Sequence, residues 1–311
     1  MGVLAGIRNE LVACPICDER IRPKFSVNAR IGGRLITIGE CRNCRLALQV
    51  PRVPPEDSAA YMDSRWSSTD PEDRYVTDPA YKLEASRRRL AWLAQFPLPS
   101  KRLLDVGAGN GAFCAAALSA GYHAAGVEIS VQAIRRAEAM YGVKLVHGSV
   151  ESLPDDVTFG IVTLWDVIEH LRDPLSVLRC ARRRLVQGGM IVVETGNYES
   201  GARLVERNEW GLWLLDHMYY FSPDSLRALL LRAGFRDATL HPLNLDAQEP
   251  SRSPSVPDQV HRAVMFQKIV RLLTRPRSLY SALYSRAFKM VARMRWPAHW
   301  NLYTITMTAY K

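Results

Sequence analysis

Apolar and polar positions between residues 83 and 243 follow a repeating order of short apolar runs and longer amphipathic stretches. The apolar runs have the length of strands, the stretches between them have helical spacing, and glycines or prolines separate the two. Strands are expected at 102–106, 123–127, 144–147, 159–165, 190–194 and 238–243, and helices at 83–96, 112–119, 131–141, 174–185 and 223–233. Apolar strands that alternate with helices predict a parallel sheet covered on both faces.

Further parts of the chain lie outside this alternation. Residues 302–310 alternate between apolar and polar side chains and predict a final strand, whereas 51–80 hold five prolines and no periodic pattern. We therefore divide the chain into a cysteine-containing module at 1–50, a linker at 51–82, a main α/β domain at 83–245 plus 301–311, and a helical insertion at 246–300.

The composition is that of a globular protein. Of 311 residues, 48% are hydrophobic and 23% are charged, which excludes a mostly disordered chain. No apolar run reaches the roughly 18 residues that a membrane-spanning helix needs. The first twelve residues are a poor signal peptide because Arg8, Asn9 and Glu10 interrupt their apolar stretch. We therefore expect a cytoplasmic protein.

The positive charge is concentrated near the end of the sequence. Residues 251–311 hold eleven basic residues and one acidic residue, so this segment accounts for the whole net charge of +10. Two amphipathic stretches within 260–296 carry Lys and Arg opposite Leu and Met. They predict either peripheral contact with the anionic inner face of a membrane or a packed element whose charges are solvated. Nucleic acid is not expected, because no recognised binding motif is present.

Four cysteines form two C-x-x-C pairs, Cys14 with Cys17 and Cys41 with Cys44. Four thiolates can coordinate a tetrahedral zinc ion. In a cytoplasmic chain, two such cysteine pairs favour a metal site over disulfides. Four protein ligands leave no open coordination position. The pattern therefore predicts a structural Zn²⁺ site.

A glycine-rich loop, Asp105-Val-Gly-Ala-Gly-Asn-Gly111, joins the first predicted strand of the main domain to a helix. Glycines let the backbone turn sharply and let a ligand approach the main chain. Glu128 ends the next strand, where a carboxylate can accept hydrogen bonds from both hydroxyls of a ribose. A tight turn without a ligand is the alternative, and the position of Glu128 disfavours it.

This loop matches the D-x-G-x-G-x-G signature, and the sequence resembles the class I S-adenosylmethionine-dependent methyltransferases. Further matches are the D-V-I-E-H-L-R-D-P segment at 166–174, Gly188-Gly189, 217–221 and 226–235. The resemblance implies a Rossmann-like seven-stranded sheet whose last two strands form an antiparallel pair. It also implies S-adenosylmethionine as the cofactor.

The resemblance assigns cofactor binding to Asp105, Gly107, Ala108, Gly109, Glu128, Ile129, Ser149, Val150 and Asp166. The backbone of 107–109 is expected at the methionyl part of the cofactor, and Glu128 at the ribose. The family usually carries Asp after Gly at the adenine position. Here Ser149 follows Gly148, and a hydroxyl makes a weaker hydrogen bond to adenine than a carboxylate does.

Methyl transfer from a sulfonium is an in-line displacement, so alignment supplies much of the catalysis, and an oxygen or nitrogen acceptor also needs a base. The candidates are His170, Glu169 and His217. With Asp166 they could instead hold a divalent metal such as Mg²⁺, a pattern similar to metal-using O-methyltransferases of ubiquinone synthesis and of small-RNA 3′ ends. The same segment occurs in metal-free relatives, where Glu169 and His170 can simply cap and brace the following helix. Over a metal site we favour His170 as the base or as a positioning group.

The cysteine module resembles a zinc unit found on some sugar methyltransferases. With the basic insertion, it suggests O-methylation of a sugar, glycan or lipid-linked precursor, that is, a small-molecule or glycan acceptor. Two alternatives stay open: a metal-assisted RNA or quinone-precursor O-methyltransferase, and an inactive cofactor-binding scaffold. Four aromatic residues are candidates for an acceptor pocket or for ordinary packing: Trp210, Trp213, Tyr219 and Tyr220. The sequence does not indicate an oligomeric state.

Overall fold

The computed structural model describes residues 12–30, 33–52, 54, 62–69, 74–241 and 304–311. The predicted basic insertion at 246–300 lies outside these residues. None of the helices in the described ranges has both the length and the apolar character needed to cross a membrane.

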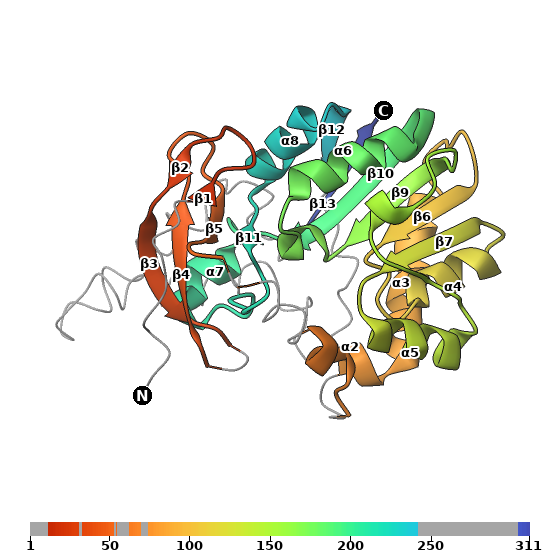
Figure 1. Cartoon of the computed structure of the whole chain (residues 1–311), viewed down its shortest axis with the longest axis horizontal. Coiled ribbons are helices and arrows are strands. Elements are labelled where there is room, and N and C mark those ends of the chain that lie inside the picture. The colour runs from red at the N-terminus through yellow and green to blue at the C-terminus, as the bar shows by residue number, and fades with distance from the viewer. Residues whose placement is uncertain (1–11, 31–32, 53, 55–61, 70–73, 242–303) are drawn as a thin grey trace, which may run out of the picture.

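A seven-stranded sheet forms the centre of the molecule, with the strand order β12-β13-β10-β9-β6-β7-β8 (Figure 1). Its strands are β6 (Arg102–Val106), β7 (His123–Glu128), β8 (Val146–His147), β9 (Phe159–Trp165), β10 (Leu185–Gly196), β12 (Arg236–His241) and β13 (Thr304–Tyr310). Neighbours from β8 to β10 are parallel, whereas β13 is antiparallel to both β10 and β12. The predicted fold class is therefore confirmed, including the antiparallel pair at the end.

Helices cover both faces of this sheet, and alternate residues of its strands face opposite layers. Leu103 and Ile161 pack with α3 (Pro79–Leu93) and α4 (Ala112–Ser119). Their neighbours in sequence, Leu104 and Val162, belong to the core on the other face, beneath α6 (Pro174–Arg184) and α8 (Pro223–Arg232). This alternation follows from the two-residue period of a strand. The remaining helical elements are α2 (Arg74–Thr77), α5 (Val131–Tyr141), α7 (Gly201–Glu206), η1 (Val150–Ser152), η2 (Ile168–His170) and η3 (Arg207–Glu209).

Helix α3 begins four residues before the predicted start at 83. The side chain of Asp78 accepts a hydrogen bond from the amide of Tyr81 at 3.0 Å, and Pro79 occupies the first turn. An Asp cap followed by proline is a strong helix start. Part of the segment that we expected to be a linker is therefore helical, because the cap outweighs the surrounding prolines.

The N-terminal strands are β1 (Val12–Ala13), β2 (Arg20–Ile21), β3 (Pro23–Asn28), β4 (Leu35–Glu40) and β5 (Ala47–Gln49). The last three form a second sheet that also takes in β11 (Tyr219–Tyr220), in the order β11-β5-β4-β3 (Figure 1). Leu46 and Leu48 also pack in one hydrophobic cluster with Tyr219, Phe221 and Leu226. The N-terminal module and the main domain thus share both a sheet and a core.

Candidate active site and cysteine cluster

The glycine loop after β6 requires glycine at its turning points. Gly107, Gly109 and Gly111 have φ of +70°, +53° and +76°, a region that other residues rarely adopt. A Cβ atom at Gly107 would lie 2.6 Å from Cγ2 of Val167, and one at Gly109 would lie 2.9 Å from the ring of Trp66. Backbone angles and space therefore both exclude a side chain here.

Glu128 lies at the end of β7 and binds the glycine loop through its carboxylate. Oε2 accepts a hydrogen bond from the amide of Gly109 at 2.8 Å. Oε1 accepts from the amides of Ile129 at 2.9 Å and Ser130 at 2.8 Å. The side chain thus joins the start of α5 to the loop between β6 and α4. A carboxylate in this position can exchange its amide donors for the hydroxyls of a ligand.

A cavity of about 410 Å³ opens above the carboxyl ends of the parallel strands. It is lined by every residue that the sequence assigned to the cofactor: Asp105, Gly107, Ala108, Gly109, Glu128, Ile129, Ser149, Val150 and Asp166. The three predicted catalytic residues, Glu169, His170 and His217, line the same cavity. The fold thus brings these residues together, although their individual roles stay predictions.

Asp105 is buried at the floor of this cavity, where the hydroxyl of Thr163 donates a hydrogen bond to Oδ1 at 2.7 Å. Burial disfavours the charged carboxylate and raises the pKa of Asp105 to about 7, although the bond from Thr163 opposes the rise. Asp105 can therefore gain or lose a proton near neutral pH.

Glu169, His170 and His217 form a cluster in the wall of the cavity. Glu169 and His170 belong to η2, which follows β9, and His217 comes shortly before β11. One side-chain ligand atom from each of the three lies within 4.8 Å of the others. The two imidazole rings meet edge to face, with their centroids 4.7 Å apart. Two imidazoles and a carboxylate can move a proton or hold a metal ion.

Asp216 completes this cluster, and the sequence analysis missed it. Nδ1 of His170 lies 3.2 Å from Oδ2 of Asp216 and 3.1 Å from the backbone oxygen of the same residue. Although burial disfavours a charged imidazole, the Asp216 carboxylate raises the pKa of His170 to about 9. Burial, together with the charge on His170, lowers the pKa of His217 to about 3. The cluster therefore pairs a charged histidine with a neutral one.

Two carboxylate oxygens of the cluster are buried without a hydrogen-bond partner among the described residues, Oε2 of Glu169 and Oδ1 of Asp216. Burial also raises the pKa of Glu169 to about 7. Buried polar atoms normally have partners, and unpaired ones point to a ligand that binds there. The unpaired oxygens fit a hydroxyl donor or a cation within the cavity.

Arg89 is a second residue of the cavity wall that the sequence analysis missed. Its Nε donates to Oε1 of Glu194 at 3.1 Å, its Nη2 lies 3.0 Å from Oδ2 of Asp166, and its guanidinium lies over the ring of Trp165. It is the last of three consecutive arginines, Arg87 to Arg89, so its identity alone did not single it out in the sequence. The available signal was its spacing, four residues before Leu93 on the buried face of α3.

Trp210, Trp213, Tyr219 and Tyr220 do not line the cavity. Each is at most 2% exposed, and three of them pack together with Tyr198 between the N-terminal sheet and the main domain. The ring centroids of Trp210 and Trp213 are 5.1 Å apart. These aromatic residues are therefore core residues in the structure.

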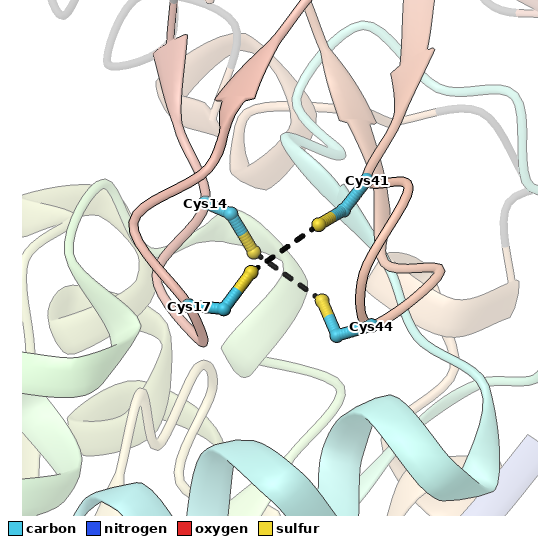
Figure 2. Close-up of side chains that lie close together, drawn as sticks. All are labelled: Cys14, Cys17, Cys41 and Cys44. Carbon is cyan, nitrogen blue, oxygen red and sulfur yellow. Dashed lines mark hydrogen bonds between the residues drawn. The ribbon is translucent and has the colours of Figure 1, made fainter.

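The four paired cysteines converge at one end of the N-terminal sheet (Figure 2). Sγ of Cys14 lies 3.4 Å from that of Cys44, and Cys17 and Cys41 are the same distance apart. These distances exclude disulfides, which need about 2.05 Å. The hydrogen bond from Cys44 lowers the pKa of Cys14 to about 5, which favours a thiolate. Four convergent sulfurs of this kind fit a tetrahedral zinc ion.

Comparison with known proteins identifies the main domain. Residues 77–240 match the family model described as a methyltransferase domain. The ubiquinone biosynthesis O-methyltransferase of Ralstonia nicotianae is 30% identical over 175 residues, covering 51% of this chain and 74% of the relative. That of Aromatoleum aromaticum is 30% identical over 172 residues, covering 50% and 74%.

A solved structure agrees at the level of the fold. The complex between the Haloferax volcanii Trm112 methyltransferase activator and a methyltransferase aligns with a TM-score of 0.51 and 18% identity, covering 80% of this chain and 96% of that chain. The matched family model spans more than half of the chain and contains the glycine loop, Glu128 and the Glu169–His170 segment. The chain therefore belongs to the class I S-adenosylmethionine-dependent methyltransferases.

Proposed function

We propose that this enzyme is an O-methyltransferase whose acceptor hydroxyl binds at the cluster of Glu169, His170 and His217. The observation that carries the proposal is one cavity that is lined both by that cluster and by the glycine loop. A cofactor bound at the glycine loop would direct its methyl group along this cavity. The curated relatives are named O-methyltransferases, which supports oxygen as the acceptor atom.

The names of those relatives favour a phenolic quinone precursor over the sugar, glycan or lipid-linked acceptor expected from the sequence. The sugar hypothesis rests on the resemblance of the cysteine module and on the basic insertion at 246–300, which lies outside the described residues. Of the two classes, the quinone precursor has the broader support, and both carry the hydroxyl that the cluster requires.

Within the cluster, His217 is the proposed base. Its imidazole is neutral, so it can accept the proton of the hydroxyl while the oxygen attacks the methyl carbon. Because burial and the charge on His170 lower the pKa of His217 to about 3, the proton would pass on to the neighbouring carboxylate of Glu169, whose pKa is about 7. The bond from carbon to sulfur breaks, its electron pair stays on sulfur, and S-adenosylhomocysteine leaves. The charged pair of His170 and Asp216 orients the second imidazole and supplies charge beside the reacting oxygen.

The same cluster fits a divalent metal. Glu169, His170 and His217 would hold the ion, which would lower the pKa of the acceptor hydroxyl. Two imidazoles suit a metal such as Mn²⁺ or Fe²⁺ better than Mg²⁺, which prefers oxygen ligands. Mg²⁺ is therefore not our candidate.

A transfer assay with radiolabelled S-adenosylmethionine tests the proposal against two acceptor sets, polyprenyl catechols and nucleotide-linked sugars. We expect methylation of the catechol, and at least a hundredfold lower kcat for His217→Asn, since a general base contributes factors of this size. His123→Asn, at an exposed histidine, is the control. Methylation of sugars alone would overturn the acceptor class. Binding of S-adenosylhomocysteine without any transfer would favour the scaffold.

The metal question has its own measurement. The enzyme is first treated with a chelator to remove any metal from the Glu169–His170–His217 cluster, and retention of zinc by the cysteine cluster is verified. It is then assayed with and without added Mn²⁺. If added Mn²⁺ restores transfer and Glu169→Gln abolishes the response, the cluster holds a metal. If activity is the same in both conditions, His217 acts without one.

We also propose that the cysteine cluster holds a structural Zn²⁺ ion. Cys41→Ser should lose the zinc and lower the midpoint of thermal unfolding, because metal binding contributes directly to folding. Cys114→Ala is the matched control, since Cys114 is buried outside the cluster. One zinc per chain in the control and none in Cys41→Ser is the expected result. Equal zinc content in both would contradict the proposal.

A further inference from the structure

Gln49 at the end of β5 contacts the loop that carries the catalytic cluster. Its side chain is buried, and Nε2 donates to the backbone oxygens of Leu214 at 3.2 Å, Leu215 at 2.9 Å and His217 at 2.8 Å. Its own backbone amide donates to the oxygen of Met218 at 3.0 Å. One residue of the N-terminal module thus contacts four carbonyls within 214–218.

Other contacts in the described structure also help to fix the shape of this loop: Nδ1 of His170 lies 3.1 Å from the backbone oxygen of Asp216, and the amide of His217 donates to the oxygen of Leu214 at 3.3 Å. Residues 214–218 contain turns and irregular backbone between η3 and β11, so no helix or sheet ladder satisfies their carbonyls. The amide of Met218 donates to the oxygen of Glu169 at 2.8 Å, which joins the loop to η2. Buried carbonyls need partners, and the amide of Gln49 supplies them. Gln49 therefore helps to place Asp216 and His217 opposite Glu169 and His170.

The cysteine cluster lies directly before this contact in the chain. The turn that holds Cys41 and Cys44 closes through hydrogen bonds from the amide of Cys41 to Leu46 and from Arg45 to Cys41, both 2.9 Å long. Strand β5 begins at Ala47, immediately after this turn. A metal ion held by the four sulfurs would fix the position from which β5 starts. Its effect would reach the loop through Gln49 and through the pairing of β5 with β11.

We propose that the cysteine module is a positioning element for the acceptor site, and that Gln49 is its positioning residue. The effect on catalysis rests on the proposed role of His217, but the effect on loop geometry does not. Neither the glycine loop nor Glu128 pairs with β5. A defect at Gln49 should therefore reach the acceptor half of the cavity and spare the cofactor half.

The test is Gln49→Met, which keeps the length of the side chain and removes its donors. We expect the Kd for S-adenosylhomocysteine and the KM for S-adenosylmethionine to stay within twofold, and kcat to fall at least tenfold, since small displacements of a reacting group are costly. In two-dimensional NMR of the histidine rings, the His217 signal, assigned by its loss in His217→Asn, should move. The His123 signal should stay in place.

Ser26→Ala is the matched control, because Ser26 is an exposed residue of β3, the strand of the same sheet farthest from β11, and its hydroxyl hydrogen-bonds to that of Thr37. It should remove a side-chain hydrogen bond from the N-terminal sheet without moving the His217 signal. An unchanged His217 signal in Gln49→Met, or the same movement in Ser26→Ala, would overturn the proposal. Should Gln49→Met not fold, Gln49→Asn carries the same test, since it keeps the amide and shortens its reach.

The two proposals fail in different ways. If His217→Asn keeps its kcat while Gln49→Met moves the His217 signal, the base assignment is wrong and the positioning role stands. If His217→Asn loses activity and Gln49→Met changes neither the signal nor kcat, the positioning role is wrong and the base assignment stands.

Discussion

The carboxylate of Glu128 accepts a hydrogen bond from the amide of Gly109 at 2.8 Å, so the acid at the end of β7 holds the glycine loop that lines the cavity. Glu128→Ala removes this bond and the proposed ribose contacts together. Since hydrogen bonds to charged groups contribute about 1.5–3 kcal/mol, we expect S-adenosylhomocysteine to bind about 10- to 100-fold more weakly. Calorimetric titration measures this change, and an unchanged Kd would remove Glu128 from the cofactor site.

Gly109→Ala should also weaken cofactor binding, because its methyl group would push against Trp66 in the cavity wall. Gly121→Ala is the matched control: its φ of +80° is similarly strained, but nothing lies within 4 Å of the added carbon. Both variants should lose about 1–2 kcal/mol of stability to backbone strain. Only Gly109→Ala should also raise the Kd for S-adenosylhomocysteine, and equal Kd values would contradict the crowding argument.

The buried pair of Arg89 and Glu194 should show strong coupling between the two positions. Arg89→Met leaves the Glu194 carboxylate buried without its cation, and breaking such pairs costs about 3–5 kcal/mol. The double variant with Glu194→Leu removes the fully buried charge and should recover most of that loss, because the other partner of Arg89, Asp166, is 25% exposed and keeps contact with water. Urea unfolding of the four proteins at pH 7 gives the coupling energy. If the two single losses add in the double variant, the pair does not stabilise the fold as described.

Burial of Asp105 should make the free energy of unfolding depend on pH between about pH 4 and pH 7. Its pKa rises from an ordinary 3.8 to about 7 on folding, so the folded protein keeps a proton that the unfolded chain releases in this window. Stability is therefore highest below pH 4 for this group and is lost as the pH rises to 7, by on the order of 4 kcal/mol. Asp105→Asn should lack this loss. If the free energy of unfolding changes with pH in the same way in both proteins from pH 5 to pH 8, the assignment is wrong.

Much of the fold could be predicted from local patterns. The strand at 102–106 agrees with β6 residue for residue, and β13 covers all of the expected strand at 302–310 that lies within the described residues. Both have strong apolar patterning. The start of α3 was misplaced because the prolines of the linker concealed the Asp78 cap. Strand β11 is only two residues long and is defined by its pairing with β5, so no local pattern could indicate it.

The candidate site also contains residues that the sequence could identify and residues that it could not. The glycine loop and Glu128 have a fixed spacing along the chain and could be found from the sequence. Asp216, Arg89 and Gln49 act through partners between 46 and 168 residues away. Their side chains are ordinary in the sequence, and only the folded chain brings them to His170, Glu194 and His217. Contacts of this kind depend on the packing of distant segments, which periodicity does not encode.

Strand β12 ends at His241 and β13 begins at Thr304, and these strands are neighbours, with His241 opposite Thr306. Because β12 runs parallel to β10, both junctions lie at the sheet edge that bears the glycine loop, and Thr304 lines the cavity. The strand order is therefore independent of the length of the intervening segment. A different segment could join the same two strands without changing their order, and it would start and end at the edge of the sheet that carries the cavity.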